Sequence, residues 1–198
     1  MIIGVDADGV LTDMQLFNYT YGQLFFNKEI INPSAYSVRE IFEVSKFQEI
    51  LYGLVYFKRY CTEWEPREGA SQVINSMKLS GNTICEITAR KFVTNKGLLG
   101  TKSRKWFEDW CRRNNFSFDE IIYCSEKYGP EEKYQACIEK KVDVMIDDRP
   151  EIVTCLASKG IKVMMMDAPY NQHVVGDNII RAFGWDDIYQ KISDFGIQ

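Results

Sequence analysis

Short apolar runs that end in polar or acidic residues recur along the chain. Each run has the length of a β-strand, and its nearly continuous apolar character is typical of a strand buried on both faces of a sheet. These runs predict strands at Ile2–Asp6, Thr83–Thr88, Ile121–Ser125, Val142–Asp147 and Lys162–Asp167.

Segments with helical periodicity lie between the later runs and after the last one. Apolar residues three and four positions apart predict helices at Ala70–Ser80, Thr101–Asn114, Pro130–Lys141, Pro150–Lys159 and Asp186–Ile192. Strands that alternate with helices of this length indicate an α/β fold with a Rossmann-like parallel sheet flanked by helices. Ligands of such sheets bind beyond the carboxyl ends of the strands, so polar residues there are candidates for a functional site.

The alternation is interrupted between Asp13 and Arg67. This stretch is rich in aromatic residues and mostly lacks strand patterning. We expect residues 15–66 to form a small helical cap inserted after the first strand, while residues 1–14 and 67–198 form the core. The alternative is that the stretch simply extends the core.

Composition and charge narrow the class of protein. An apolar content of 45% over 198 residues is enough for a real core and excludes a disordered chain. The net charge of -4 argues against a nucleic-acid partner, which normally requires a basic face, but it allows a small phosphorylated substrate. No signal peptide is recognisable, and no apolar run approaches the roughly 20 residues of a membrane span.

The cysteines and the single histidine argue against a zinc centre. None of the six cysteines forms a Cys-x-x-Cys pair or a Cys/His cluster. Several cysteines lie inside apolar patterns, which is typical of free thiols in a reducing compartment. We therefore expect a cytoplasmic protein.

The first predicted strand ends in two carboxylates, Asp6 and Asp8, followed by Gly9. Two acids at the end of a buried strand are unfavourable unless something compensates them, and a divalent cation is the natural partner. Asp6 could attack a phosphoryl group, and Asp8 could protonate the leaving group and then activate water. Gly9 would allow the chain to turn sharply. A simple turn or a fragment of a calcium loop is the alternative, but the further acids of an EF-hand are missing.

The second predicted strand ends at Thr88, which Ala89 and Arg90 follow. A hydroxyl and free backbone N–H groups at a strand end suit phosphate oxygens, and a guanidinium can bind an anion with two parallel hydrogen bonds. Alternatively, Thr88 caps a helix and Arg90 is a solvated charge.

A further strand ends in Asp147 and Asp148, just before Pro150. One acid is explained as the N-cap of a helix that begins with proline. The second acid, at the edge of a buried strand, is not explained in this way.

These motifs, in this order, resemble those of the haloacid dehalogenase superfamily of aspartyl-phosphate phosphotransferases. The resemblance implies that Thr88 contacts phosphate and that a lysine holds the nucleophile and the phosphate together. Lys133, in the first turn of the helix before Asp147, fits that position, and Lys127 competes with it. The resemblance also implies a Mg²⁺ ion, with the metal ligands Asp6, Asp8, Asp147 and Asp148. The catalytic residues would be Asp6, Asp8, Thr88 and Lys133, and the phosphate-binding residues Gly9, Ala89 and Arg90.

Within the superfamily, the chain is similar to the 5′(3′)-deoxyribonucleotidase-like branch, which includes bacterial nucleotidases. The segment Asp167–Asn171, followed by Arg181 and Trp185, contributes to this similarity. The branch carries a small helical cap of the C1 type, and it implies a magnesium-dependent 5′-nucleotidase that acts through an aspartyl-phosphate. A sugar- or polyol-phosphate phosphatase, a phosphotransferase or mutase, and an inactive scaffold protein are the alternatives. The expected partner is a nucleoside monophosphate or a sugar phosphate, and a homodimer is compatible with the sequence.

Overall fold

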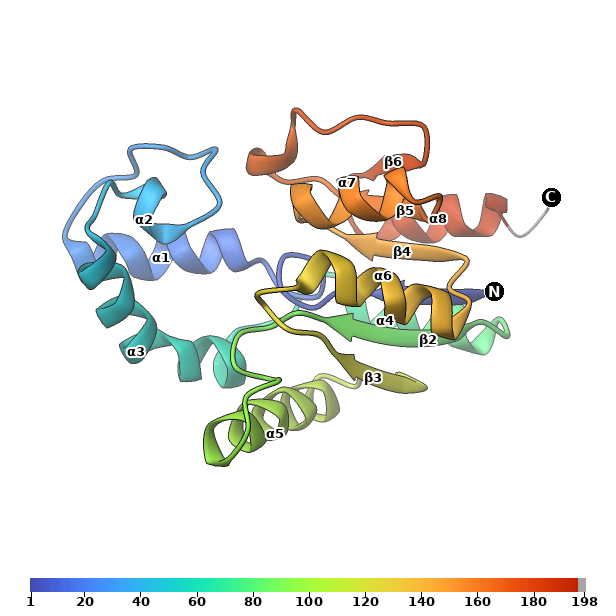
Figure 1. The fold of residues 1–198 in the computed structure, drawn as a ribbon, viewed down its shortest axis with the longest axis horizontal. Helices are drawn as coiled ribbons and strands as arrows, with labels where there is room; N and C mark the ends of the chain where they lie inside the picture. The colour runs from blue at the N-terminus through green and yellow to red at the C-terminus, as the bar shows by residue number, and fades with distance from the viewer. Residues whose placement is uncertain (196–198) are drawn as a thin grey trace.

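The computed structural model describes residues 1–195, and these residues contain a six-stranded parallel sheet with helices on both faces (Figure 1). The α/β fold predicted from the hydrophobic pattern is therefore confirmed. In their order across the sheet, the strands are β3 (Glu120–Tyr123), β2 (Thr83–Thr88), β1 (Ile2–Val5), β4 (Val144–Asp147), β5 (Lys162–Met166) and β6 (Ile179–Ala182).

The strand β6 was not among the strands predicted from the sequence. It is a four-residue edge strand that pairs with β5, so that Val163 lies opposite Ile179. Three of its residues are only half-buried, and Arg181 interrupts its apolar run. A short and partly polar run of this kind lacks the continuous apolar pattern that identified the inner strands.

The two faces of the sheet are covered by different sets of helices. Alternate residues of a strand point to opposite faces, so Ile3 and Val5 pack on one face while Ile87 and Met145 pack on the other. The first face is covered by α4 (Ala70–Leu79), α5 (Leu98–Arg113) and α8 (Trp185–Phe195), and the second by α6 (Gly129–Lys140) and α7 (Pro150–Ser158).

Residues 14–63 form helices α1 (Met14–Phe26), α2 (Val38–Ile41) and α3 (Lys46–Glu63), and the structure assigns no strand within this range. The side chain of Asp13 caps α1 by accepting a hydrogen bond from Leu16 N, and Ser45 forms a capping box with Gln48 at the start of α3. These helices enclose an aromatic cluster of their own, separate from the two faces of the sheet. They lie beyond the carboxyl ends of the strands (Figure 1).

The two chain crossings between this helical segment and the sheet lie side by side. Thr12 forms an isolated bridge with Pro66, and Arg67 N donates to Leu11 O at 2.7 Å. Both ends of the segment are thereby fixed at the end of β1.

The described part of the chain contains no helix that is both long and apolar enough to cross a membrane. All six cysteines are free; five of them are buried, and Cys155 is half-buried.

Candidate active site

Three adjacent strands bring together the main site residues that the sequence predicts. β1 lies between β2 and β4, and this is the point in the sheet from which the chain continues to both sides, where α/β folds bind their ligands. Asp6 follows β1, Thr88 ends β2, and Asp147 ends β4. Asp6 N donates to Ile146 O at 2.9 Å, which extends the strand pairing and fixes Asp6 next to Asp147.

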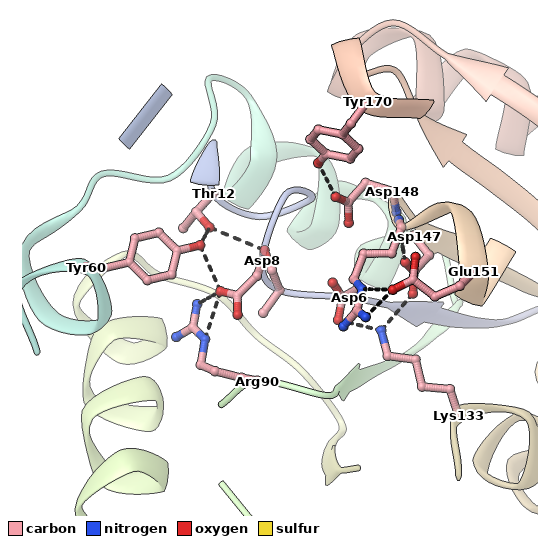
Figure 2. A network of polar contacts seen from close by, with 12 residues as sticks. Asp6, Asp8, Thr12, Tyr60, Arg90, Lys133, Asp147, Asp148, Glu151 and Tyr170 are labelled. Atoms are coloured by element: carbon pink, nitrogen blue, oxygen red, sulfur yellow. Dashed lines mark hydrogen bonds and ion pairs between the residues drawn. The ribbon is translucent and has the colours of Figure 1, made fainter. Parts of the chain in front are cut away.

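Lys133 connects two of these carboxylates (Figure 2). Its Nζ atom lies 2.6 Å from Asp6 Oδ1 and 2.7 Å from Asp147 Oδ2, and its side chain is fully buried. Lys127, the competing candidate, is exposed and lies over the ring of Tyr128. The geometry thus favours Lys133 for the lysine that holds the nucleophile.

The cluster carries more negative than positive charge. Burial raises the pKa of Asp6, and the Lys133 ammonium opposes this only in part. Burial and the neighbouring Asp147 and Asp6 raise the pKa of Asp148 well above its usual value. Burial alone would lower the pKa of Lys133, but Asp147 and Asp6 more than offset it, so the net shift is upward and Lys133 stays charged.

These side chains fit a divalent cation. Asp6, Asp147 and Asp148 are all buried, and each offers a carboxylate oxygen within 4.8 Å of the others. Oδ1 of Asp148 is buried without a hydrogen-bond partner. One ammonium facing three ionised carboxylates would leave a net charge of about −2, which one Mg²⁺ or Ca²⁺ ion would neutralise.

Gly9 makes room for this acidic cluster. A Cβ atom at this position would lie 2.1 Å from Asp148 Oδ2, and the backbone has a φ of +92°, which favours glycine. The other oxygen contacts of Asp148 come from the segment after β5: the Tyr170 hydroxyl donates to Asp148 Oδ2, and Asn171 Nδ2 donates to the Asp148 carbonyl at 2.8 Å.

The carboxylate of Asp8 belongs to a second cluster beside the first (Figure 2). Arg90 Nε lies 2.9 Å from Asp8 Oδ1, and Arg90 Nη2 binds the same oxygen. The Tyr60 hydroxyl donates to Asp8 Oδ1 at 2.8 Å and lies 2.6 Å from Thr12 Oγ1. Asp8 is not among the carboxylates that converge, so the structure does not place its side chain with the candidate metal ligands Asp6, Asp147 and Asp148.

The charged and phenolic members of this second cluster keep their protons. Burial alone would lower the pKa of Arg90, but the Asp8 carboxylate more than offsets this, and the pKa lies well above its usual value. Burial and the adjacent Asp8 raise the pKa of Tyr60 well above its usual value. A protonated phenol and a guanidinium therefore both face Asp8 at neutral pH.

A cavity of about 240 Å³ opens beside the two clusters. Asp6, Asp8, Thr88, Ala89 and Arg90 contribute to its wall, whereas Gly9 does not line it and packs against Asp148. Oγ1 of Thr88 is buried without a hydrogen-bond partner, which suits a donor to a phosphate oxygen. The opposite wall comes from α1, α3 and the loop before α2, with the aromatic residues Phe17, Tyr36, Tyr52, Tyr56, Phe57 and Tyr60.

Comparison with known protein families gives this arrangement an identity. The model of the family described as "5′ nucleotidase, deoxy (Pyrimidine), cytosolic type C protein" matches residues 1–195. The chain belongs to this family. It is accordingly a phosphatase of the haloacid dehalogenase type, which confirms the resemblance drawn from the motifs.

Individual relatives agree with this membership of the nucleotidase family. A nucleotidase from Clostridium acetobutylicum is 24% identical over 189 residues, covering 94% of this chain and 91% of the relative. A haloacid dehalogenase-like hydrolase from Streptococcus pneumoniae shares the fold, with a TM-score of 0.62 and 14% identity, over 96% of this chain and 97% of that chain. So does D,D-heptose 1.7-bisphosphate phosphatase from B. bronchiseptica, solved with magnesium and phosphate, with a TM-score of 0.59 and 12% identity over 98% of both chains.

Some residues of the nucleotidase-family site were missed by the sequence analysis. Tyr60 lies among many aromatic residues of the segment, and nothing in its spacing distinguishes it from them. Thr12 lies only four residues after Asp8, but no pattern in the sequence marks it as a site residue. Tyr170 was noted only as part of a similar segment, and its contact with Asp148 emerges only from the fold.

Proposed function

We propose that this chain is a magnesium-dependent 5′-nucleotidase that acts through an aspartyl-phosphate on deoxyribonucleoside monophosphates. The observation that carries the proposal is Asp6, a buried carboxylate that directly follows β1, is held by Lys133 and borders the cavity. A carboxylate in this position can attack a phosphorus atom that is held in line with it.

The metal would be held by Asp6, Asp147 and Asp148, the residues whose oxygens converge. Mg²⁺ bound there would screen the charge of the phosphate and stabilise the charge that develops during transfer. Lys133 supplies a second positive charge and keeps Asp6 oriented. Thr88 Oγ1 and the backbone N–H groups of Ala89 and Arg90 are suited to the phosphate oxygens.

The reaction would proceed in two steps on the chain's own residues. An oxygen of Asp6 bonds to phosphorus as the bond to the leaving oxygen breaks, and Asp8 protonates the leaving oxygen. Asp8 then accepts a proton from water, whose oxygen displaces Asp6 from phosphorus. Inorganic phosphate leaves, and both carboxyl groups return to their starting states.

We also propose that residues 15–66 act as a cap that selects the leaving group. The aromatic wall of the cavity comes from this segment, while the acids come from the sheet. Flat rings beside a phosphate site can stack on a nucleobase, and stacking tolerates several bases. The free cysteines support a cytoplasmic location for this enzyme.

Phosphate release from a panel of substrates tests the proposal. The panel pairs deoxyuridine and deoxyadenosine monophosphates with deoxyribose 5-phosphate, which lacks a base, and with hexose phosphates. We expect release that requires Mg²⁺, stops with EDTA, and has its highest kcat/KM with a nucleotide. Equal or faster release from the base-free sugar phosphates would replace the substrate with a sugar phosphate and keep the mechanism. Release that persists in EDTA would contradict the metal requirement.

A further inference from the structure

Asp8 is held asymmetrically, and this asymmetry goes beyond what the proposed reaction requires. Oδ1 accepts hydrogen bonds from Arg90 Nε at 2.9 Å, from Arg90 Nη2 and from the Tyr60 hydroxyl at 2.8 Å. Within residues 1–195, nothing hydrogen-bonds Oδ2. Since Asp8 also lines the cavity, the two oxygens of one carboxyl group have different environments.

The direction of the hydrogen bonds in this cluster follows from the number of protons. Tyr60 has a single hydroxyl proton, and Asp8 Oδ1 is its acceptor. The 2.6 Å contact between Tyr60 and Thr12 therefore requires Thr12 Oγ1 to be the donor. The alternative acceptor of the Thr12 proton, Ala7 O, lies farther away at 3.4 Å. The result is a chain of donors from Thr12 through Tyr60 to Asp8.

Tyr60 is buried against other side chains, and it comes from a different part of the fold than Asp8. It lies near the end of α3, with its ring centroid 4.9 Å from that of Phe17 and 5.4 Å from the guanidinium carbon of Arg90. Residues Tyr60 and Thr12 are both buried. The hydrogen bond from the Tyr60 hydroxyl to Asp8 therefore depends on the position of the helical segment.

We propose that Tyr60, oriented by Thr12, is a positioning residue that fixes Asp8 Oδ1 and leaves Oδ2 as the oxygen that exchanges protons with the leaving group and with water. This inference rests on the proposed phosphatase mechanism and assigns an atom within it. In the first step the electron pair of the broken P–O bond stays on the leaving oxygen, which takes the proton from Asp8 Oδ2. In the second step a proton of the attacking water returns to Oδ2.

The test uses leaving groups that differ in their need for a proton. A nucleoside alkoxide must be protonated as it leaves, whereas p-nitrophenolate leaves without a proton. Tyr60→Phe removes only the hydroxyl and keeps the ring. Single-turnover release of the leaving group should fall about tenfold for the nucleotide, as expected for the loss of one orienting hydrogen bond, and less than about twofold for p-nitrophenyl phosphate.

Further variants separate positioning from a general structural effect. Thr12→Val, like Tyr60→Phe, should lower the rate for the nucleotide relative to the rate for p-nitrophenyl phosphate. Thr12→Ser, which keeps a hydroxyl, should restore this ratio of rates. Tyr19→Phe is the matched control, because the Tyr19 hydroxyl of the same helical segment donates to Pro33 O and does not line the cavity. Tyr19→Phe should leave the release rates of both substrates unchanged.

A second readout needs neither metal nor turnover. In the metal-free protein, the ¹³Cγ resonance of Asp8 should move in Tyr60→Phe and stay in place in Tyr19→Phe.

An equal fall in rate for both substrates in Tyr60→Phe, or an unmoved Asp8 resonance, would overturn the positioning role while leaving the phosphatase proposal standing. A wild-type chain that releases p-nitrophenolate but no nucleoside would overturn only the nucleotide substrate, and the comparison is then made with the alkyl phosphate that it cleaves. A wild-type chain without activity on any phosphate ester would overturn both proposals.

Discussion

Two regions supply the cavity residues: the edge of the sheet formed by the carboxyl ends of β1, β2 and β4, and the helical segment of residues 14–63. They hold these residues by different physical means. At the edge, Asp6 follows β1 and Asp147 ends the neighbouring β4, so the backbone hydrogen bonds of the sheet determine where the carboxylates lie. In the segment, aromatic rings are held by other rings: the centroids of Tyr52 and Tyr56 are 5.1 Å apart, and those of Tyr21 and Tyr56 are 5.0 Å apart. Backbone pairing fixes atoms closely, whereas ring packing tolerates adjustment.

This difference suggests a division of labour between the two regions. Reaction chemistry requires groups to be placed within fractions of an ångström, and the strand ends provide that placement. Recognition of a flat base requires contact area, which packed rings provide. Substitutions at the edge should therefore affect kcat, and substitutions of segment residues that only line the cavity should affect KM; Tyr60, which reaches Asp8, belongs with the edge in this respect.

The sharpest test of the edge is Asp6→Asn, which changes one atom and keeps the shape of the side chain. If Asp6 is the nucleophile, kcat should fall by at least about 1000-fold, because an amide cannot form the acyl phosphate. Circular dichroism should show an unchanged fold. The exposed Asp177→Asn serves as the control and should retain full activity. Activity within tenfold of wild type in Asp6→Asn would remove Asp6 from the nucleophile position.

Lys133→Met tests whether the edge depends on its buried cation. Without metal, this change leaves Asp6 and Asp147 without their ammonium partner, and the free energy of unfolding should fall by about 3 to 5 kcal/mol. Activity should be lost as well. Urea unfolding in EDTA measures the first effect, and phosphate release measures the second.

Lys127→Met is the matched control for this lysine. Lys127 is exposed, so the same substitution should change the free energy of unfolding by less than about 0.5 kcal/mol. Loss of activity in Lys127→Met with normal activity in Lys133→Met would reverse the assignment of the two lysines.

The segment is tested by Tyr56→Ala, which removes a ring from the cavity wall. Base stacking contributes about 1 to 3 kcal/mol, so KM for a nucleotide should rise roughly 5- to 150-fold while kcat changes little. KM for a base-free sugar phosphate should stay the same. Phe47→Ala, on the same helix but 68% exposed and outside the cavity, should change neither. A fall in kcat without a change in KM would contradict the division between edge and segment.

The sequence predicted the edge far better than the segment, and the reason is physical. Strand pairing turns a one-dimensional pattern into a shared edge, so the acids at the ends of apolar runs could be assigned to one site before the fold was known. The bond from Tyr60 to Asp8 joins residues 52 positions apart and depends on how α3 packs. The pairing of Arg90 with Asp8, rather than with solvent or phosphate, depends in the same way on packing.

The last prediction concerns Glu86, a buried acid of β2 that the proposed reaction does not use. Both of its carboxyl oxygens are buried without a hydrogen-bond partner, and burial, reinforced by Asp6, raises its pKa well above the ordinary value of 4.5. The folded chain therefore keeps a proton on Glu86 that the unfolded chain loses above pH 4.5, so this residue makes the fold less stable as pH rises. Glu86→Gln has no such proton. The difference in free energy of unfolding between Glu86→Gln and wild type should therefore grow in favour of the variant by about 1.4 kcal/mol for each pH unit above 4.5, until Glu86 also ionises in the folded protein.

Urea unfolding at pH 5, 6 and 7 in EDTA measures this gain, and the exposed Glu139→Gln should show none. A difference between Glu86→Gln and wild type that stays constant over this range would mean that Glu86 is ionised in the fold and is stabilised by a cation such as Arg90.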